Sequence, residues 1–397
     1  MKPAEVIVVG GGIVGLATAW QTLCQRPDTK LLVLEKEEGP GRHQTSHNSG
    51  VLHTGVYYAP GSLKAQNCVA GRKAMVEFCE EHGIAFEVCG KVIVATREAE
   101  LPRLEQLHER ATANGVRCEL IGPEQLAELE PHAAGLRALR VPDAGIADFP
   151  AVAHKLADLI QRAGGEVHTG VRVTRVREDT GEIAVETTKG AFAGQKLVSC
   201  AGLHADRVTR LSGRKPPAKI VPFRGEYYEF VPDAPRLCHN LIYPVPDPAF
   251  PFLGVHLTRT VEGPIHAGPN AVLALAREGY KRSKIDLQDL FESLTYPGFL
   301  RLALRYWRTG AGEMRRSASK SAFVGALQRL VPEVRAEHLS PAPAGVRAQA
   351  VRPDGGIVDD FLVVETNRML HVLNAPSPAA TASLSIGASL AEKLIQR

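Results

Sequence analysis

Several features are scarce in this chain of 397 residues, and each absence excludes a class of protein. The seven cysteines are scattered, odd in number and include no C-x-x-C pair. This favours reduced thiols over a disulfide framework, and we predict no zinc or other metal site. No apolar run reaches the roughly 18 residues that a membrane-spanning helix needs. The chain has no internal repeat or low-complexity linker, and a net charge of only +4 gives no reason to expect nucleic acid as a partner.

The composition that is present is typical of a globular protein. Hydrophobic residues make up 44% and charged residues 23% of the chain, and its length suffices for two intertwined domains with a large core. The N-terminus does not resemble a signal peptide, because only Lys2 provides positive charge and glycines interrupt the apolar run. We therefore expect a cytoplasmic protein.

The most informative stretch is VIVVGGGIVGLATAW, which runs from Val6 to Trp20. Four β-branched residues lead to Gly10, Gly12 and Gly15 at G-x-G-x-x-G spacing, and an apolar helix pattern follows. The first glycine permits a tight turn, the second lets the backbone approach a pyrophosphate, and the third lets helix and strand pack closely. The helix start also presents free N–H groups to phosphates. Glu35, at the end of the next apolar strand, is placed to bind a ribose, so we predict a dinucleotide site.

The segment after Glu35 favours FAD over NAD as the dinucleotide. NAD enzymes usually continue directly into another βα unit, whereas here a long loop follows that is rich in Gly, Ser, Thr, His and Asn. Such a loop supplies backbone and hydroxyl donors along an extended, permanently bound cofactor.

Apolar strand patterns alternate with helix patterns along much of the chain. The segments at 196–211 and at the C-terminus repeat the order of strand, small-residue turn and helix. This predicts an α/β fold (α+β overall) with a discontinuous, Rossmann-like FAD-binding domain and a second, mainly antiparallel-sheet substrate domain. We expect the first domain to comprise residues 1–88, 143–216 and 340–397, and the second to comprise 89–142 and 217–339.

Six motifs, in order, extend this interpretation across the chain: RHQTSHNSGVLHTGVYYAPGSLKA, FRGEYYEF, GVHLTRTVEGPIHAGPNAVLALAREGY, RRSASKSAFVGALQRLVPE, AGVRAQAV and NAPSPAATASLSIG. The chain resembles the D-amino-acid-oxidase-like flavoproteins and, within them, the L-2-hydroxyglutarate oxidase/dehydrogenase family. The resemblance implies oxidation of L-2-hydroxyglutarate to 2-oxoglutarate, with hydride transfer from C2 to FAD and reoxidation by a quinone or oxygen. The chain lacks the N-terminal extension of mitochondrial relatives, so we expect a bacterial cytoplasmic form.

The family resemblance and the helix-start pattern together assign the cofactor residues. We expect Pro376 to Thr381 to begin the C-terminal helix, whose free N–H groups and dipole would stabilise negative charge on reduced flavin. The alternative for this segment is an ordinary loop between a helix and a strand. The residues predicted to bind FAD are Gly10, Gly12, Ile13, Val14, Gly15, Glu35, Lys36, Thr45, Ser46, Asn48, Ser49, Gly50, Val173, Ala201, Gly202, Pro376, Ser377, Pro378, Ala379, Ala380 and Thr381.

Oxidation of a 2-hydroxy acid requires a base for the hydroxyl proton, and a neutral imidazole suits this task near pH 7. His256 in GVHLT lies where the family places a histidine over the substrate, and His53 in SGVLHTG lies on the flavin-facing loop. We favour His256 as the base and His53 as a flavin or substrate contact. Because the chain has 14 histidines, the alternative is that either one is a packing residue.

The substrate's carboxylates require cationic or hydrogen-bonding partners. Arg347 lies in a segment that resembles the carboxylate-binding turn of glycine and sarcosine oxidases, and its planar guanidinium suits a bidentate pair. The candidates for the second carboxylate are Arg224, Tyr58, Arg259 and Asn270. The alternative for Arg224 and Arg259 is a surface ion pair.

Two alternatives to this function remain open: an amine or amino-acid oxidase of the glycine/sarcosine type, and a flavin-carrying redox sensor. An amine oxidase would not need two cationic clamps. The segment 299–320 mixes arginines with apolar residues and suggests weak peripheral contact with the inner face of the cell membrane. We favour the interpretation in which its leucines and Trp307 pack on the core, and expect quinone analogues to be better acceptors than oxygen.

Overall fold

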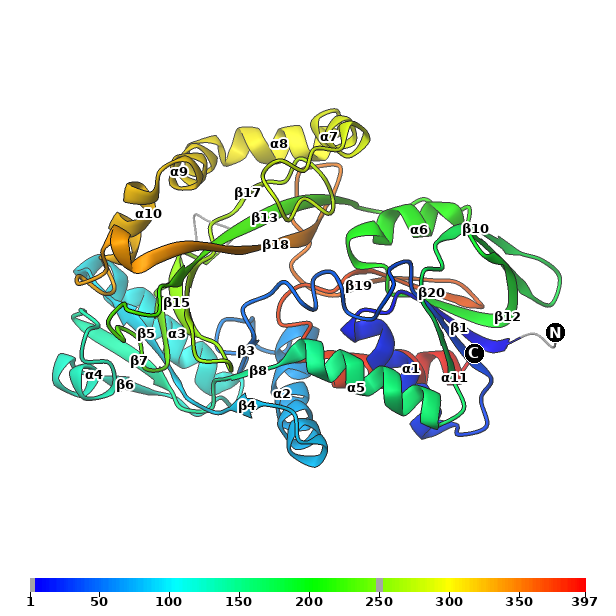
Figure 1. Cartoon of the computed structure of the whole chain (residues 1–397), viewed down its shortest axis with the longest axis horizontal. Coiled ribbons are helices and arrows are strands. Elements are labelled where there is room, and N and C mark those ends of the chain that lie inside the picture. Colours follow the sequence, from blue (N-terminus) through cyan, green and yellow to red (C-terminus); the bar gives the residue numbers. More distant parts are fainter. Residues whose placement is uncertain (1–3, 248–252) are drawn as a thin grey trace.

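The computed structural model describes residues 4–247 and 253–397 and places them around two large sheets (Figure 1). The first sheet lies in the half of the molecule that contains both chain ends, and the second lies in the other half. The predicted parallel sheet with a second, mainly antiparallel layer is confirmed.

The first sheet has the N-terminal strand at its centre. β1 (Ala4–Val9) pairs in parallel with β2 (Leu31–Leu34) and with the end of β12 (Gly190–Ser199). These strands read as nearly continuous apolar runs, because helices and strands cover both faces of such a sheet. The remaining strands are β9 (Glu166–His168), β10 (Val173–Glu178), β11 (Ile183–Thr187), β19 (Leu362–Glu365) and β20 (Met369–Asn374).

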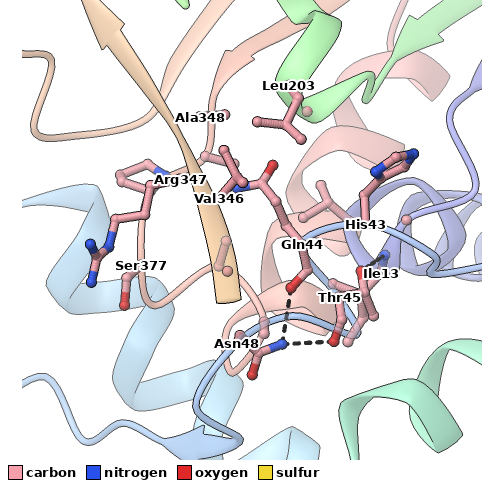
Figure 2. A pocket seen from close by; sticks show the side chains of 18 of the residues that line it. Ile13, His43, Gln44, Thr45, Asn48, Leu203, Val346, Arg347, Ala348 and Ser377 are labelled. Atoms are coloured by element: carbon pink, nitrogen blue, oxygen red, sulfur yellow. Dashed lines mark hydrogen bonds between the residues drawn. The ribbon is translucent and has the colours of Figure 1, made fainter. Parts of the chain in front are cut away.

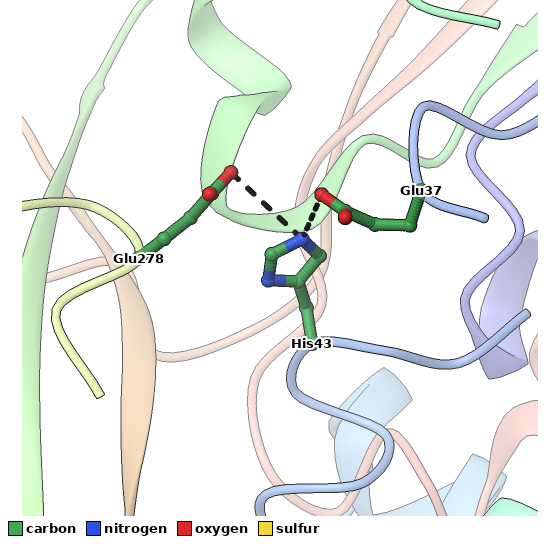
Figure 3. A group of neighbouring side chains, drawn as sticks. All are labelled: Glu37, His43 and Glu278. Atoms are coloured by element: carbon green, nitrogen blue, oxygen red, sulfur yellow. Dashed lines mark hydrogen bonds and ion pairs between the residues drawn. The ribbon is translucent and has the colours of Figure 1, made fainter. Parts of the chain in front are cut away.

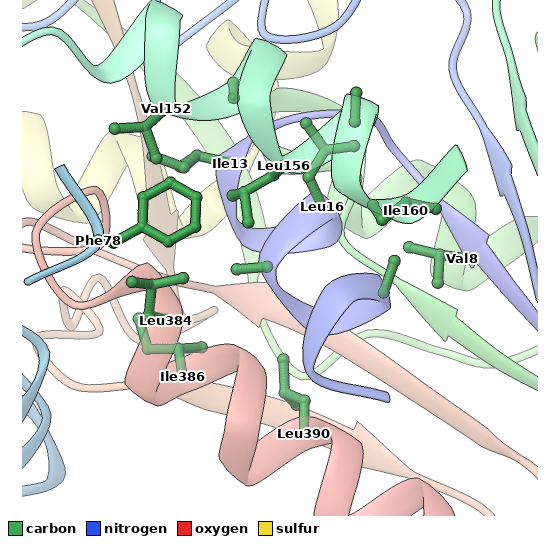
Figure 4. Packing of buried hydrophobic residues seen from close by; sticks show 14 of the residues in the cluster. Val8, Ile13, Leu16, Phe78, Val152, Leu156, Ile160, Leu384, Ile386 and Leu390 are labelled. Atoms are coloured by element: carbon green, nitrogen blue, oxygen red, sulfur yellow. The ribbon is translucent and has the colours of Figure 1, made fainter. Parts of the chain in front are cut away.

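Four helices form the apolar core beside this sheet. α1 (Ile13–Gln25) packs between α5 (Phe149–Arg162) and α11 (Ser383–Ile395), and their apolar side chains interdigitate (Figure 4). The contact between α1 and α11 is close, because a Cβ on Gly387 would lie 2.6 Å from the carbonyl carbon of Ala17. Phe78 and Met75 of α2 (Leu63–His82) complete this core.

The second sheet is built around two long antiparallel strands, β13 (Lys219–Phe230) and β18 (Leu339–Val351), which pair along their lengths. On the other side of β13 the strands follow in the order β16, β15, β14, β5, β7 and β6. Their bounds are β5 (Lys91–Ala95), β6 (Glu119–Ile121), β7 (Arg137–Val141), β14 (Leu241–Pro244), β15 (His256–Arg259), β16 (Ile265–Gly268) and, also on β13, β17 (Val272–Leu273).

Smaller elements connect and cover the two sheets. Helices α7 to α10 follow one another along the outer side of the second sheet (Figure 1). These and the other elements are α3 (Leu101–Ala113), α4 (Pro123–Leu129), α6 (Ala205–Leu211), α7 (Leu287–Leu294), α8 (Pro297–Arg305), α9 (Trp307–Ala318), α10 (Lys320–Leu327), the small sheet of β3 (Val51–Leu52), β4 (Phe86–Glu87) and β8 (Gly145–Ala147), and the 3₁₀ turns at Glu98–Glu100, Gly202–His204 and Ala336–His338.

One expectation changes. The predicted domain bounds stay a prediction, and β18, near the start of the C-terminal portion, pairs with β13 of the second sheet. The C-terminal helix begins at Ser383, and the segment from Pro376 to Thr381, predicted to start this helix, forms turns before it. Two prolines in that segment limit the backbone N–H groups that could support a helix there.

Candidate active site

A cavity of about 780 Å³ lies between the two sheets and is lined by residues from both. This volume is within the range of small-molecule and cofactor sites. Figure 2 shows Ile13 and Thr45 toward one side of the view, Arg347 and Ser377 toward the other, and Asn48 between them. The cavity is therefore extended, with the N-terminal glycine turn and strand β18 at different places along it.

The glycine turn has the geometry that its spacing predicts. Gly10 has a φ of +109°, and a Cβ there would lie 2.5 Å from the carbonyl oxygen of Cys200. A Cβ on Gly15 would lie 2.1 Å from the carbonyl oxygen of Gly10, so helix and strand pack as closely as expected. Gly12 faces the cavity, where among the described residues a Cβ would contact only the Thr45 hydroxyl, at 3.7 Å. The turn thus leaves room beside Gly12 for a phosphate to approach the backbone.

Glu35 and the loop after it are held against this turn. Glu35 accepts hydrogen bonds from the backbone N–H groups of Gly11, at 2.6 Å, and Glu37, at 2.9 Å. The Thr45 hydroxyl accepts a bond from the N–H of Ile13 at 3.1 Å, at the start of α1. Asn48 stiffens the loop by donating to the carbonyl of Thr45 at 2.7 Å (Figure 2). The chain therefore presents a carboxylate, a hydroxyl and a helix N-terminus to one end of the cavity.

Three of the predicted cofactor residues lie outside the cavity lining. Gly15 is buried against Gly10, Ser46 donates to the carbonyl of Gly41 at 2.6 Å, and the carbonyl of Gly50 accepts from Ala147 at 2.8 Å. Each shapes the loop or turn instead of facing the cavity. The predicted residues that line the cavity are Gly10, Gly12, Ile13, Val14, Glu35, Lys36, Thr45, Asn48, Ser49, Val173, Ala201, Gly202, Pro376, Ser377, Pro378, Ala379, Ala380 and Thr381.

A cluster of ionic side chains closes the cavity near Lys36. The Lys36 ammonium contacts Glu37 and lies 2.6 Å from Oε1 of Glu278. Figure 3 shows the two carboxylates on either side of His43, whose Nε2 lies 3.0 Å from Glu37. His204 also bonds Glu278, at 2.9 Å. Because Lys36 supplies the positive charge that the carboxylates require, these contacts tie the loop after β2 to the segment after β17.

His256 lies in the cavity wall with one imidazole nitrogen engaged. Its Nδ1 lies 2.8 Å from the carbonyl of Gly254, so this nitrogen carries the proton and Nε2 is the acceptor. The imidazole stacks on Tyr243, with ring centroids 3.8 Å apart, and the residue is only 5% exposed. Burial is the main reason that the pKa of His256 falls to about 3, and the charges of Lys91 and Arg347 lower it further. The imidazole is therefore neutral at physiological pH.

His53 is the other predicted catalytic histidine in the lining. Its backbone N–H donates to the Thr381 hydroxyl at 3.2 Å, while that hydroxyl donates to the carbonyl of Val51 at 3.1 Å. Its Nδ1 is buried and has no hydrogen-bond partner among the described residues. Burial lowers its pKa well below the usual value. Both predicted catalytic histidines therefore line one cavity as neutral imidazoles.

Arg347 reaches the cavity from β18. Its side chain donates to the carbonyl of Asn270 at 3.3 Å. In the backbone register of β18 and β13, Arg347 lies opposite Phe223. Tyr58, a candidate for the second carboxylate, also lines the cavity.

The other three candidates for the second carboxylate lie outside the cavity lining. Arg224 binds Glu226 at 2.9 Å. Gly225 lines the cavity, and because neighbouring residues of a strand point to opposite faces, Arg224 and Glu226 point away from the cavity. The Asn270 side chain also binds Glu226, donating at 2.8 Å, and Arg259 pairs with Glu87. Substrate contact by these three residues stays a prediction. Both arginines form ion pairs, but that of Arg224 with Glu226 is buried and is not the surface pair expected as the alternative.

Sequence reasoning missed several aromatic and basic residues around the histidines. Tyr57, Tyr227 and Tyr243 line the cavity, and the Tyr57 hydroxyl is buried with no partner among the described residues. Lys91 lies behind two of these rings. The alternation of side chains along FRGEYYEF could have indicated Tyr227, but nothing in the apolar strand at 91–95 indicated its lysine.

Comparison with known proteins identifies relatives over almost the whole chain. The family model described as DAO, FAD dependent oxidoreductase, matches residues 5–393. An L-2-hydroxyglutarate dehydrogenase of Indibacter alkaliphilus is 49% identical over 395 residues, which cover 99% of each chain. An L-2-hydroxyglutarate dehydrogenase of Escherichia coli is 44% identical, and the match covers 98% of this chain and 93% of that one.

A solved structure shares the fold. Dithionite-reduced L-alpha-glycerophosphate oxidase from Mycoplasma pneumoniae with FAD bound superposes with a TM-score of 0.82 at 21% identity, covering 100% of this chain and 96% of that one. The predicted Rossmann-like FAD-binding architecture is thereby confirmed. The cavity fits an extended dinucleotide, because Gly12 is open toward it and the lining continues from the glycine turn to the segment from Pro376 to Thr381.

We expect Glu35→Ala to weaken FAD binding, because a hydrogen bond from a ribose to a charged group contributes about 1.5–3 kcal/mol, or roughly ten- to a hundredfold in affinity. Glu38→Ala, which changes an exposed carboxylate in the same loop, is the matched control. Retention of FAD through dialysis measures the effect, with thermal unfolding to correct for the lost Gly11 bond. Equal retention by the two variants would show that Glu35 does not bind the ribose.

Proposed function

The chain belongs to the family of FAD-dependent oxidoreductases, and on that premise we propose that it oxidises L-2-hydroxyglutarate to 2-oxoglutarate. The observation that carries the proposal is that Arg347 and His256 line one cavity, the first as a cation and the second as a neutral imidazole. A 2-hydroxy acid needs both a partner for its carboxylate and an acceptor for its hydroxyl proton. The near full-length similarity to L-2-hydroxyglutarate dehydrogenases supports the choice of substrate.

Each residue has a defined task in this proposal. When bound, FAD accepts the two electrons removed from C2 of the substrate. His256 takes the hydroxyl proton at Nε2, because its Nδ1 is engaged by the carbonyl of Gly254. Arg347 binds the carboxylate next to C2, and the carbonyl of Asn270 orients its guanidinium. The rings around His256 exclude water from the reacting atoms.

The second carboxylate requires a second site, which we assign to the region of Tyr58 and Lys64. Both line the cavity, and the Lys64 ammonium lies 4.7 Å from the centre of the Tyr58 ring. Glu35 and Asp359 are the acidic side chains among the described lining residues, whereas arginines and lysines are more numerous. Lys64 and Arg347 line the cavity together with Tyr58, and two cations favour a dianionic substrate over glycine or sarcosine, which carry a single carboxylate.

The test of the function is anaerobic mixing of the yellow holoenzyme with L-2-hydroxyglutarate. We expect this compound to bleach the flavin absorbance, and expect glycine and sarcosine at the same concentration to leave it unchanged. Bleaching by either amine instead would establish the amine-oxidase alternative. An unchanged spectrum with all three compounds would contradict both enzymatic proposals.

The lowered pKa of His256 changes the pH dependence expected from an ordinary histidine. If the base were an imidazole with its usual pKa, the rate of flavin reduction would fall below about pH 6.5, because the imidazole would become protonated. Because the pKa of His256 is about 3, we expect the rate of flavin reduction to stay level as pH falls from about 6.5 to 5. His256→Ala should slow this step by about 10²- to 10⁴-fold.

His371, a buried histidine outside the cavity lining, offers the control variant His371→Ala. Stopped-flow measurement of flavin reduction distinguishes the two variants. Similar rates of flavin reduction in the two variants, at matched FAD content, would show that His256 is not the base.

We also propose that a quinone rather than oxygen is the electron acceptor and that helices α8 and α9, in the segment 299–320, contact the membrane. The sequence favoured core packing for this segment, but Leu304 is 75% and Trp307 is 62% exposed, so that expectation is wrong for these two residues. Arginines lie on both α8 and α9 and would attract anionic lipids. Among the described residues, no helix combines the length and apolar character required to span a bilayer.

We expect the protein to float with anionic vesicles at low salt and to detach at high salt, because cations near a lipid surface contribute about 1 kcal/mol each. Replacement of Leu304 and Trp307 by serine should abolish flotation. Leu136→Ser, at an exposed leucine on another surface, should not. Reoxidation by air as fast as by a quinone analogue would contradict the choice of acceptor, and absence of flotation at any salt concentration would contradict membrane contact.

A further inference from the structure

A row of side chains crosses three neighbouring strands behind the candidate base. β5 pairs with β14 in parallel, which places Ile93 opposite Tyr243, and the antiparallel register of β14 and β15 places Tyr243 opposite His256. Lys91 is two residues before Ile93. Because side chains alternate between the faces of a sheet, Lys91, Tyr243 and His256 lie on the same face.

The ammonium of Lys91 is held by aromatic rings. Its Nζ lies 4.0 Å from the centre of the Tyr243 ring and 5.4 Å from that of Tyr57. The His256 imidazole covers one face of Tyr243 at 3.8 Å, so the ammonium lies against the other face. Lys91 is 2% exposed and does not line the cavity, whereas both tyrosines do. The charge is therefore separated from the cavity by the rings that form its wall.

No carboxylate among the described residues forms an ion pair with Lys91. Within the described part of the chain, only the thiols of Cys68 and Cys89 favour its charged form, and burial raises the pKa of both. Burial also lowers the pKa of Lys91 to about 8, so it is charged at pH 7. A buried cation without an anion is unfavourable unless a ligand supplies the missing charge.

We propose that Lys91 is a positioning residue for the oxidation of L-2-hydroxyglutarate: its ammonium, behind Tyr243, attracts the anionic substrate toward His256. This inference rests on the proposed function for its substrate. It requires no direct contact between Lys91 and the ligand, because charge acts over several ångströms in a poorly solvated site. The aromatic rings fix the position of the charge.

The neighbourhood of Lys91 allows its titration to be identified. Burial raises the pKa of the surrounding phenols and thiols and lowers that of the imidazoles, so Lys91 is the group of this set expected to change charge near pH 8. Lys64, near His53, also has a lowered pKa and is the second lysine to test. The titratable groups that face Lys91 are Tyr57, Tyr243, Cys68, Cys89, His53 and His256.

The experiment measures anion binding separately from turnover. Glutarate has both carboxylates but no hydroxyl at C2, so its effect on the flavin spectrum of the holoenzyme gives a Kd without reaction. In the wild type we expect the Kd to rise as pH passes about 8. Lys91→Arg should move this rise to higher pH, because a guanidinium stays charged. Lys91→Met should remove the rise and weaken binding at pH 7 by about tenfold, whereas Lys64→Met should keep the rise near pH 8.

The outcomes separate this inference from the proposed function. A wild-type Kd in Lys91→Met at pH 7, or a rise near pH 8 that persists in it, would overturn the role of Lys91. Equal losses in the Arg and Met variants, with unchanged FAD content and thermal stability, would likewise show that charge is not what matters. Glutarate binding that depends on Lys91, without bleaching by L-2-hydroxyglutarate, would contradict the oxidation and support the anion-attracting charge.

Discussion

The pairing of β13 with β18 determines how the two halves of the molecule face each other. These strands pair from Lys219 with Val351 to Phe230 with Leu339, and the chain continues from β18 into β19 and β20 of the first sheet. A Cβ on Gly345 of β18 would lie 2.5 Å from the carbonyl oxygen of His47, so this strand passes directly against the loop after β2. The same strand therefore closes the cavity and brings Arg347 into it.

The electrostatics of the site follow from where the carboxylates are placed. Glu226 binds Arg224, Arg282 and Asn270. Glu278 binds Lys36 and His204. Because these partners offset the negative charge of the two carboxylates, the carboxylates repel an anionic ligand less. Arg347 and Lys91 remain near the imidazoles. Burial then keeps the imidazoles neutral, which leaves proton acceptors beside positive charge. Such a site suits a substrate that is anionic and must lose a proton.

The dinucleotide end of the site was predictable because its determinants are local. The turn at Gly10, the helix start at Ile13 and the acid at Glu35 lie within two adjacent strands and one helix, and their spacing alone specifies the geometry. The substrate end depends on strand register, which the sequence does not reveal. Arg224 and Arg347 lie on adjacent strands, one position out of register, and face opposite sides of the sheet. The proposed role of Lys91 could not be predicted from the sequence, because it depends on the rings of Tyr57 and Tyr243, which lie in distant segments of the chain.

The most direct test is the affinity of Arg347→Lys for L-2-hydroxyglutarate, measured by anaerobic stopped-flow reduction alongside its FAD content. Lysine keeps the charge but loses the planar fork that binds a carboxylate through two hydrogen bonds. We expect the substrate Kd to rise by about tenfold or more, while FAD binding remains that of the wild type. An unchanged substrate Kd would contradict the placement of the substrate's carboxylate against β18.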